Sequence, residues 1–229
     1  MKSKTDKTSI FNIQSQSGFT LIEIGIAIFI LAIGLISMLT IFPIGVDSMK
    51  KVTQYSNAAV FSESALSYLK ANDVVGFVGT NTGNNTYPDI DPDQDNQFED
   101  SSGNIISAQY SWQAVVQNVT TDNNLVRAQI AVFRNFNSSQ FGTGTADFTL
   151  ASQTVSSVSA FPSWLTSKHY IRVKDVSSDD KFWYRIDNVG TSSSEIFLEG
   201  EFLGSGGNGL TFSTTKDIID IYETMFSKR

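Results

Sequence analysis

The chain has 229 residues, of which 41% are hydrophobic and 17% are charged, and its formal net charge is −7. Such an apolar content with so little charge excludes a wholly disordered chain, and the acidic excess argues against nucleic-acid binding, which needs clustered Lys and Arg. The lack of cysteine excludes disulfides, thiolate metal sites and a cysteine nucleophile. The single histidine, His169, argues against a multi-histidine metal site or a Ser-His-Asp hydrolase. We find no enzyme constellation and expect the protein not to be an enzyme.

An apolar segment, FTLIEIGIAIFILAIGLISMLTIF, runs from Phe19 to Phe42. Its 24 residues carry one charge, Glu23, and as a helix they are long enough to cross about 30 Å of hydrocarbon. The apolar core of an ordinary secretory signal is shorter, about 7–15 residues. We therefore expect a single transmembrane helix, and the lysines of the polar segment 1–18 favour a cytoplasmic N-terminus.

Glu23 needs a physical reason, because a carboxylate inside an apolar helix is costly and usually has a partner. It lies about one helical turn after Phe19, near the end of the apolar segment. The simplest interpretation is an interfacial Glu that reaches the lipid headgroups, which end positions tolerate.

Residues 18–23, GFTLIE, suggest a second interpretation of Glu23. They resemble the processing motif of type IV prepilins, with Gly before Phe and Glu as the fifth residue after the cut. The resemblance implies that a prepilin peptidase cleaves between Gly18 and Phe19 on the cytoplasmic side and N-methylates Phe19. It also implies that Glu23 pairs with the N-terminal amine of a neighbouring subunit in a filament. Opposite charges in a low-dielectric helix bundle attract strongly, which agrees with such a pairing.

The helical pattern continues beyond the apolar segment, to about residue 72. A stripe of side chains at alternating steps of three and four predicts that this second half packs on a globular domain. Pro43 removes a backbone hydrogen bond and marks a point where the helix can deform. The expected stripe consists of Val52, Tyr55, Ala59, Ser62, Leu66 and Leu69.

Residues 73–104 are rich in Gly, Asn, Asp and Pro and are expected to form a connecting loop. Acidic residues alternate in this loop as the oxygen ligands of a Ca²⁺ loop do. Gln94 stands where a calcium loop has Gly, and an Asp stands where it has Glu, so a solvated acidic loop without metal is the alternative. The candidate ligands are Asp89, Asp91, Asp93, Asp95 and Asp100; we expect no cofactor that the protein requires, and Ca²⁺ is the one candidate.

From Ile105 the period of the apolar residues changes to two, which predicts a β-hairpin with a TDNN turn. A third strand is expected over roughly 146–157. A long helix followed by an antiparallel meander is the α+β layout of pilins, and the hairpin resembles that of PilV-type minor pilins. The expected inward faces are Tyr110, Trp112, Ala114 and Val116, opposite Val126, Ala128, Ile130 and Val132.

Residues 161–229 begin with FPSW, a candidate linker, and contain several short strand patterns separated by polar turns. They predict a small, separate β-barrel or sandwich. The run GSGGNG at 204–209 is expected to be a turn or loop, because it lacks the Lys-Ser/Thr of a phosphate-binding loop. Phe182 and Tyr184 are expected on one face of a strand and Trp183 on the other, in a core or exposed for carbohydrate or protein contact.

The resemblance implies a minor pilin or pilin-like structural subunit of a type IV filament. Its partners would be the prepilin peptidase and other pilin subunits. It would lie in the inner membrane with its C-terminal part outside the cytoplasm, and after assembly in a cell-surface or periplasmic filament. The alternatives are a pseudopilin of a type II secretion system and a surface adhesin anchored by a pilin helix. The expected parts are a leader (1–18), a long helix (19–72, with 19–42 transmembrane), an acidic loop (73–104), a pilin-like sheet (105–160) and a β extension (161–229).

Overall fold

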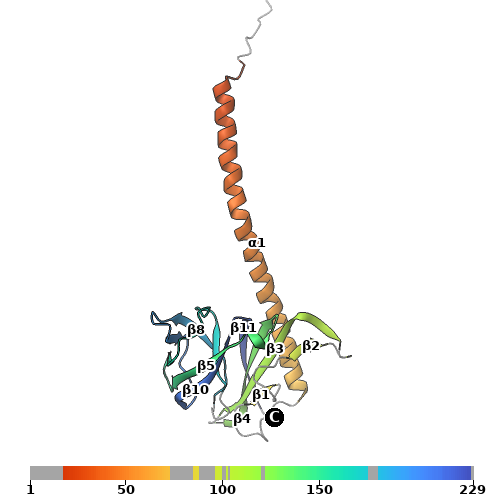
Figure 1. The fold of residues 1–229 in the computed structure, drawn as a ribbon. Helices are drawn as coiled ribbons and strands as arrows, with labels where there is room; N and C mark the ends of the chain where they lie inside the picture. The colour runs from red at the N-terminus through yellow and green to blue at the C-terminus, as the bar shows by residue number, and fades with distance from the viewer. Residues whose placement is uncertain are drawn as a thin grey trace, which may run out of the picture. The chain divides into compact units, whose positions relative to one another are not determined.

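The protein, seen here in a computed structural model, is an α+β chain of one long helix and antiparallel β-sheets (Figure 1). The structure describes residues 18–72, 85–87, 96–99, 102, 104–119, 122–174 and 180–227. The chain divides into two compact units, residues 1–51 and 52–229. The helix, α1 (Leu21–Ala71), contributes to both units, and every strand of the described residues belongs to the second.

The part of α1 in the first unit exposes apolar side chains on all of its sides, from Leu21 to Met49. By length and composition alone, α1 is a helix that could cross a membrane, and it is the only such helix among the described residues. The helix continues through Pro43 without a break in its assigned residues. The expected long helix is thus present over almost the whole of 19–72.

The part of α1 in the second unit packs on the sheet, but through a stripe that differs from the expected one. Val52, Tyr55 and Ala59 were expected on the packed face and are exposed. Because a helix turns by about 100° per residue, Ala58 and Ala59 point to different sides of α1, and Ala58 is the one on the packed side. The observed buried positions are Ala58, Ser62, Ala65 and Leu69, with Phe61 and Leu66 partly buried beside them.

The sheet has the strand order β1-β3-β4-β11, and β2 also pairs with β3. β3 and β4 form the predicted hairpin, and the eight side chains expected on one face lie in the core that α1 covers. Because β4 begins at Asp122, most of the expected TDNN turn belongs to the strand. The bounds are β1 (Asn85–Tyr87), β2 (Asn96–Glu99), β3 (Ile105–Val119), β4 (Asp122–Arg134) and β11 (Ile218–Ser227).

A six-stranded closed barrel, in the order β10-β5-β6-β9-β8-β7, is inserted in the chain between β4 and β11. Its core holds Phe148, Val155, Ile171, Ile196 and Phe212, among others. A short 3₁₀ helix, η1 (Ser138–Gln140), precedes it. The bounds are β5 (Gly142–Thr149), β6 (Thr154–Ser156), β7 (Tyr170–Val173), β8 (Tyr184–Val189), β9 (Glu195–Leu198) and β10 (Gly206–Thr215).

The strand pairing does not follow the expected division at residue 161. β5 and β6 lie before that point and were expected in the first sheet, but they pair in the barrel. β11 lies after it, yet pairs with β4 from Ile218↔Phe133 to Ser227↔Leu125 (Figure 1). A local period of two predicts that a segment is a strand, but it does not reveal the strand with which that segment pairs, because pairing depends on packing against distant residues. Residues 161–229 are therefore not a separate extension.

The glycine run at 204–209 also differs from the expected turn, because β10 begins within it at Gly206. Gly206 and Gly209 have positive φ angles of 76° and 67°, which glycine adopts at little cost. The pairing of β10 with β5 shifts between Gly207 and Leu210, as in a β-bulge. The glycines thus bend a barrel strand instead of ending it.

Candidate functional site

The start of α1 is a complete capping box formed by Thr20 and Glu23. The Thr20 carbonyl accepts the N–H of Ile24 at 3.2 Å, which makes Thr20 the N-cap. The N–H of Glu23 donates to Thr20 Oγ1 at 3.3 Å, and the N–H of Thr20 donates to Glu23 Oε2 at 3.0 Å. This reciprocal pair satisfies two backbone donors that a helix start otherwise leaves unpaired. Glu23 therefore has a local structural role that the sequence interpretation did not include.

The Glu23 carboxylate keeps one oxygen available for a second partner. The hydroxyl of Thr20 also donates to Oε2, at 2.9 Å, so both side-chain contacts of the capping box converge on that atom. In the described part of the chain no donor reaches Oε1. A carboxylate oxygen accepts hydrogen bonds at more than one lone pair. The capping box and an external charge partner are thus compatible.

Gly18 and Phe19, the residues of the expected cleavage site, precede the helix and are exposed. Phe19 is 85% exposed, and a Cβ added at Gly18 would have no heavy atom within 4 Å. The bond between them is therefore on the surface of the chain, where an enzyme can reach it. The five expected calcium ligands, Asp89 to Asp100, lie outside the described residues, so the structure does not test that prediction.

A cleft of about 660 Å³ lies where the barrel meets the sheet in the second unit. We call it the sheet–barrel cleft. The sheet contributes residues of β4 and β11, and the barrel contributes β7, β8 and the segment that leads to β10. It is lined by Arg127, Gln129, Tyr170, residues 182–185 and 199–201, Leu203, Asp220, Ile221 and Glu223.

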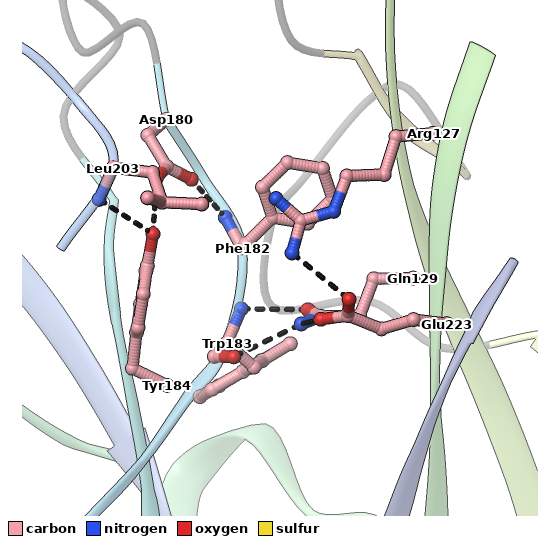
Figure 2. Close-up of polar contacts among 8 residues, drawn as sticks. All are labelled: Arg127, Gln129, Asp180, Phe182, Trp183, Tyr184, Leu203 and Glu223. Atoms are coloured by element: carbon pink, nitrogen blue, oxygen red, sulfur yellow. Dashed lines mark hydrogen bonds and ion pairs between the residues drawn. The ribbon is translucent and has the colours of Figure 1, made fainter. Parts of the chain in front are cut away.

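Gln129, in β4, links the backbone of Trp183, which lines the cleft, to the sheet (Figure 2). Its Oε1 accepts the backbone N–H of Trp183 at 2.7 Å, and its Nε2 donates to the Trp183 carbonyl at 3.0 Å. Its Nε2 also donates to Glu223 Oε1 at 3.0 Å. One side chain of β4 thus holds a barrel segment and a side chain of β11 together.

Asp180 and Tyr184 fasten the same segment on the barrel side (Figure 2). Asp180, which is buried, accepts the N–H of Phe182 at 2.8 Å and the hydroxyl hydrogen of Tyr184. The Tyr184 hydroxyl accepts the N–H of Leu203 at 3.0 Å. Burial, and then the charge of Asp180, raise the pKa of Tyr184 well above its usual value of 10. The tyrosine therefore stays a neutral donor at any physiological pH.

Arg127 closes one wall of the cleft. Its Nη2 lies 2.9 Å from Glu223 Oε2, and its guanidinium lies 4.4 Å from the centre of the Phe182 ring (Figure 2). An Arg over an aromatic face is attracted by the electrons of the ring. The arrangement covers Phe182 and holds the guanidinium and carboxylate in fixed positions.

The positions of Phe182 and Trp183 correct the expected alternation. β8 begins at Tyr184, so the three aromatic residues are not in one strand. Phe182 is 2% exposed and Trp183 3%, and Trp183 packs with Phe133 and Phe141 between sheet and barrel. Neither ring is exposed for carbohydrate contact. The polar residues of the cleft carried no sequence signal, because Gln129 and Glu223 become neighbours only through the pairing of β4 with β11.

No protein-family model matches the chain, and no curated protein sequence matches it.

Proposed function

We propose that the chain is a minor pilin or pilin-like structural subunit of a type IV filament. The observation that carries the proposal is the order of three features: an exposed Gly18-Phe19 bond, a capped helix start with Glu23, and a long apolar helix surface. A prepilin peptidase would cleave the Gly18–Phe19 bond and methylate the new amine of Phe19. The role is structural, and no enzymatic activity is proposed.

The exposed apolar surface of α1 supports two successive environments. The first unit of the chain buries none of the large apolar side chains between Phe19 and Phe42. A helix surface that is apolar on all sides is unfavourable in water, so lipid or other helices are expected to bury it. We infer that the helix is a single-pass inner-membrane anchor before assembly and exchanges lipid for neighbouring helices in a cell-surface or periplasmic filament. The second unit would lie outside the cytoplasm.

The Glu23 carboxylate would pair with the N-terminal amine of a neighbouring subunit. The amine is created by cleavage, and Glu23 Oε1 has no donor within the described chain. Leaving a charge unpaired in a low-dielectric helix bundle is costly, so each subunit would favour a neighbour that supplies the opposite charge. The capping box would keep the carboxylate at the helix start in both environments.

Two alternatives share the N-terminal features. A pseudopilin of a type II secretion system would be processed in the same way. A surface adhesin would use α1 as an anchor and the inserted barrel, residues 142–215, as its binding part. After the last barrel strand, β10, the chain forms β11 of the sheet, so the barrel is an insertion and not a terminal domain. The adhesin alternative therefore has to be tested on the whole chain.

Mass spectrometry of the N-terminus tests the proposal, with protein taken from native membranes and from sheared surface filaments. A chain that begins with methylated Phe19 in the filament fraction is the expected result. A processed chain found only in membranes would favour the pseudopilin. An intact Met1 in both fractions would overturn the proposal.

A further inference from the structure

We infer that the sheet–barrel cleft is a binding site for a lysine- or arginine-bearing segment of a partner protein. The inference goes beyond the proposed structural role and does not depend on it. It concerns a site formed only by residues of the second unit, and it specifies the chemistry of what binds there.

The size and the rigidity of the cleft suit a few side chains of a peptide. Its volume of about 660 Å³ is within the range of ordinary ligand sites, about 300–1,000 Å³. Gln129 holds the Trp183 backbone from the sheet side, and Asp180 holds Phe182 and Tyr184 from the barrel side. Because these floor residues are already fixed, a ligand would not have to order them, and a preorganised site loses less affinity on binding.

The charges of the cleft favour a cationic ligand. Both arginines of the lining already have carboxylate partners: Arg127 lies 2.9 Å from Glu223 and Arg185 lies 3.5 Å from Glu199. The other two carboxylates of the lining, Glu201 and Asp220, form no ion pair in the described part of the chain.

The lining as a whole holds four carboxylates and two guanidinium groups. Burial is the main cause that raises the pKa of Tyr170 to about 12; the negative charge of Asp220 adds to the rise, and the positive charge of Arg185 opposes it. A negative field in a partly enclosed cleft concentrates cations.

The same residues argue against a metal ion and against a sugar. No group of three acidic or histidine side chains that could hold a metal ion occurs among the described residues. A Ca²⁺ ion would need several such oxygens around one centre. The Phe182 and Trp183 rings are buried and Arg127 covers Phe182, so neither ring offers a face on which a sugar can stack. Amino and guanidinium groups can each pair with a single carboxylate, so a cationic segment fits this lining better.

Pentalysine binding to the full chain in detergent micelles, measured by the anisotropy of a labelled peptide, tests the inference. The double variant Glu201→Gln/Asp220→Asn keeps the shapes of the side chains and should weaken binding by about two- to twentyfold, the sum of two partly exposed charge pairs. Asn at 220 can still accept the N–H of Ile221, as Asp220 Oδ1 does at 2.9 Å. The variant Arg185→Gln frees Glu199 and should strengthen binding.

Matched controls separate the cleft from the overall acidity of the protein. Glu63→Gln/Glu195→Gln makes the same change in net charge at exposed positions outside the cleft and should leave pentalysine binding unchanged. Pentaglutamate should not bind. Absence of pentalysine binding, or equal weakening by both double variants, would overturn the inference. Binding of neutral maltohexaose or cellohexaose without binding of pentalysine would overturn it in favour of a sugar site. None of these results depends on cleavage at Gly18.

Discussion

The side-chain amide of Gln129 pairs with the backbone of Trp183 as a neighbouring strand would. It accepts the Trp183 N–H at 2.7 Å and donates to the Trp183 carbonyl at 3.0 Å. Gln113, in the neighbouring strand β3, also faces the barrel, where its Oε1 accepts hydrogen bonds from Arg172 Nη1 at 2.9 Å and Trp183 Nε1 at 3.2 Å. Two glutamines of the sheet therefore make polar contacts with residues of the inserted barrel region.

Replacing Gln129 should destabilise the second unit. Gln129→Leu keeps a similar volume but leaves the buried Trp183 N–H and carbonyl without these partners, and each such group costs about 1–3 kcal/mol. We expect the free energy of unfolding to fall by about 2–4 kcal/mol. Urea unfolding of the full chain in detergent, followed by tryptophan fluorescence, measures it. Gln109→Leu, at an exposed position of β3, is the control. Equal stability of both variants would show that Gln129 does not hold the barrel.

The α+β class, the long helix and the inward face of the hairpin could be predicted from the sequence, because each depends on a local period. The opposite face of the hairpin could not. Gln113 and Gln129 are polar residues in strands and are typical of a solvent face, yet they are only 1% and 2% exposed because the barrel covers them. What covers a strand is decided by residues far away in the chain.

The candidate sites also differ in whether the sequence could predict them. The proposed cleavage and assembly residues lie in one contiguous run, and even the capping box follows from the Thr-x-x-Glu spacing of Thr20 and Glu23. The sheet–barrel cleft requires Arg127 to meet Glu223, 96 positions later, through the pairing of β4 with β11. No local pattern specifies that pairing, and it was outside the reach of the sequence.

Gly18→Ile should block processing. A side chain at this position meets no atom of the protein within 4 Å, so the fold should tolerate it and the effect should come from the peptidase. We expect only the unprocessed chain, with its N-terminal segment, by mass spectrometry of membranes. Gly25→Ile is the matched control inside the apolar helix, where an added Cβ is equally unhindered, and it should be processed normally. A mature product from Gly18→Ile would contradict the cleavage site.

Variants of Glu23 should separate its charge from its capping role. Gln can replace Glu in a capping box, so Glu23→Gln should keep the helix start and lose only the charge. We expect normal cleavage, with incorporation into filaments reduced by about tenfold or more because a charge partner is lost. Glu23→Ala should likewise be cleaved normally and incorporated poorly. The amount of mature chain in membranes measures cleavage, and the amount in sheared filaments measures incorporation.

Thr20→Val is the complementary variant, since it removes the hydroxyl contacts of the capping box and keeps the charge of Glu23. It should be incorporated into filaments nearly as well as the unchanged chain. If Glu23→Gln assembled normally and Thr20→Val did not, Glu23 would act through the helix start and not through a pair with the neighbouring amine.

The acidic loop should bind Ca²⁺ if its alternating carboxylates act as ligands, a prediction that still depends on the sequence alone. A ligand that binds only the folded state stabilises it, so we expect Ca²⁺ to raise the melting temperature of the full chain by about 3–8 °C over its value in EDTA. Asp91→Asn/Asp93→Asn should abolish the rise, whereas Glu63→Gln/Glu195→Gln should not. An equal melting temperature with Ca²⁺ and with EDTA would leave a solvated acidic loop.

His169, the one histidine of the chain, lies just before β7 in a partly buried position. Its Nδ1 accepts the N–H of Thr166 at 3.0 Å, and its ring packs edge-on against Trp164 at 5.5 Å between ring centres. Because Nδ1 is an acceptor, the neutral ring carries its proton on Nε2. Burial, and then the positive charge of Lys216, lower the pKa of His169 below its usual value of 6.5.

Acid should therefore destabilise the barrel through His169. Below about pH 6.5 the unfolded chain binds a proton that the folded chain does not, so the free energy of unfolding should fall as the pH drops through that value. The fall should end at the lowered pKa of the folded state, where both states are protonated. His169→Gln cannot titrate and should show a smaller slope between pH 7.5 and 5 in urea unfolding of the full chain. The imidazole signal in NMR gives the folded pKa directly, since no other histidine overlaps it. Equal slopes in the two proteins, or an NMR pKa above 6.5, would contradict the prediction.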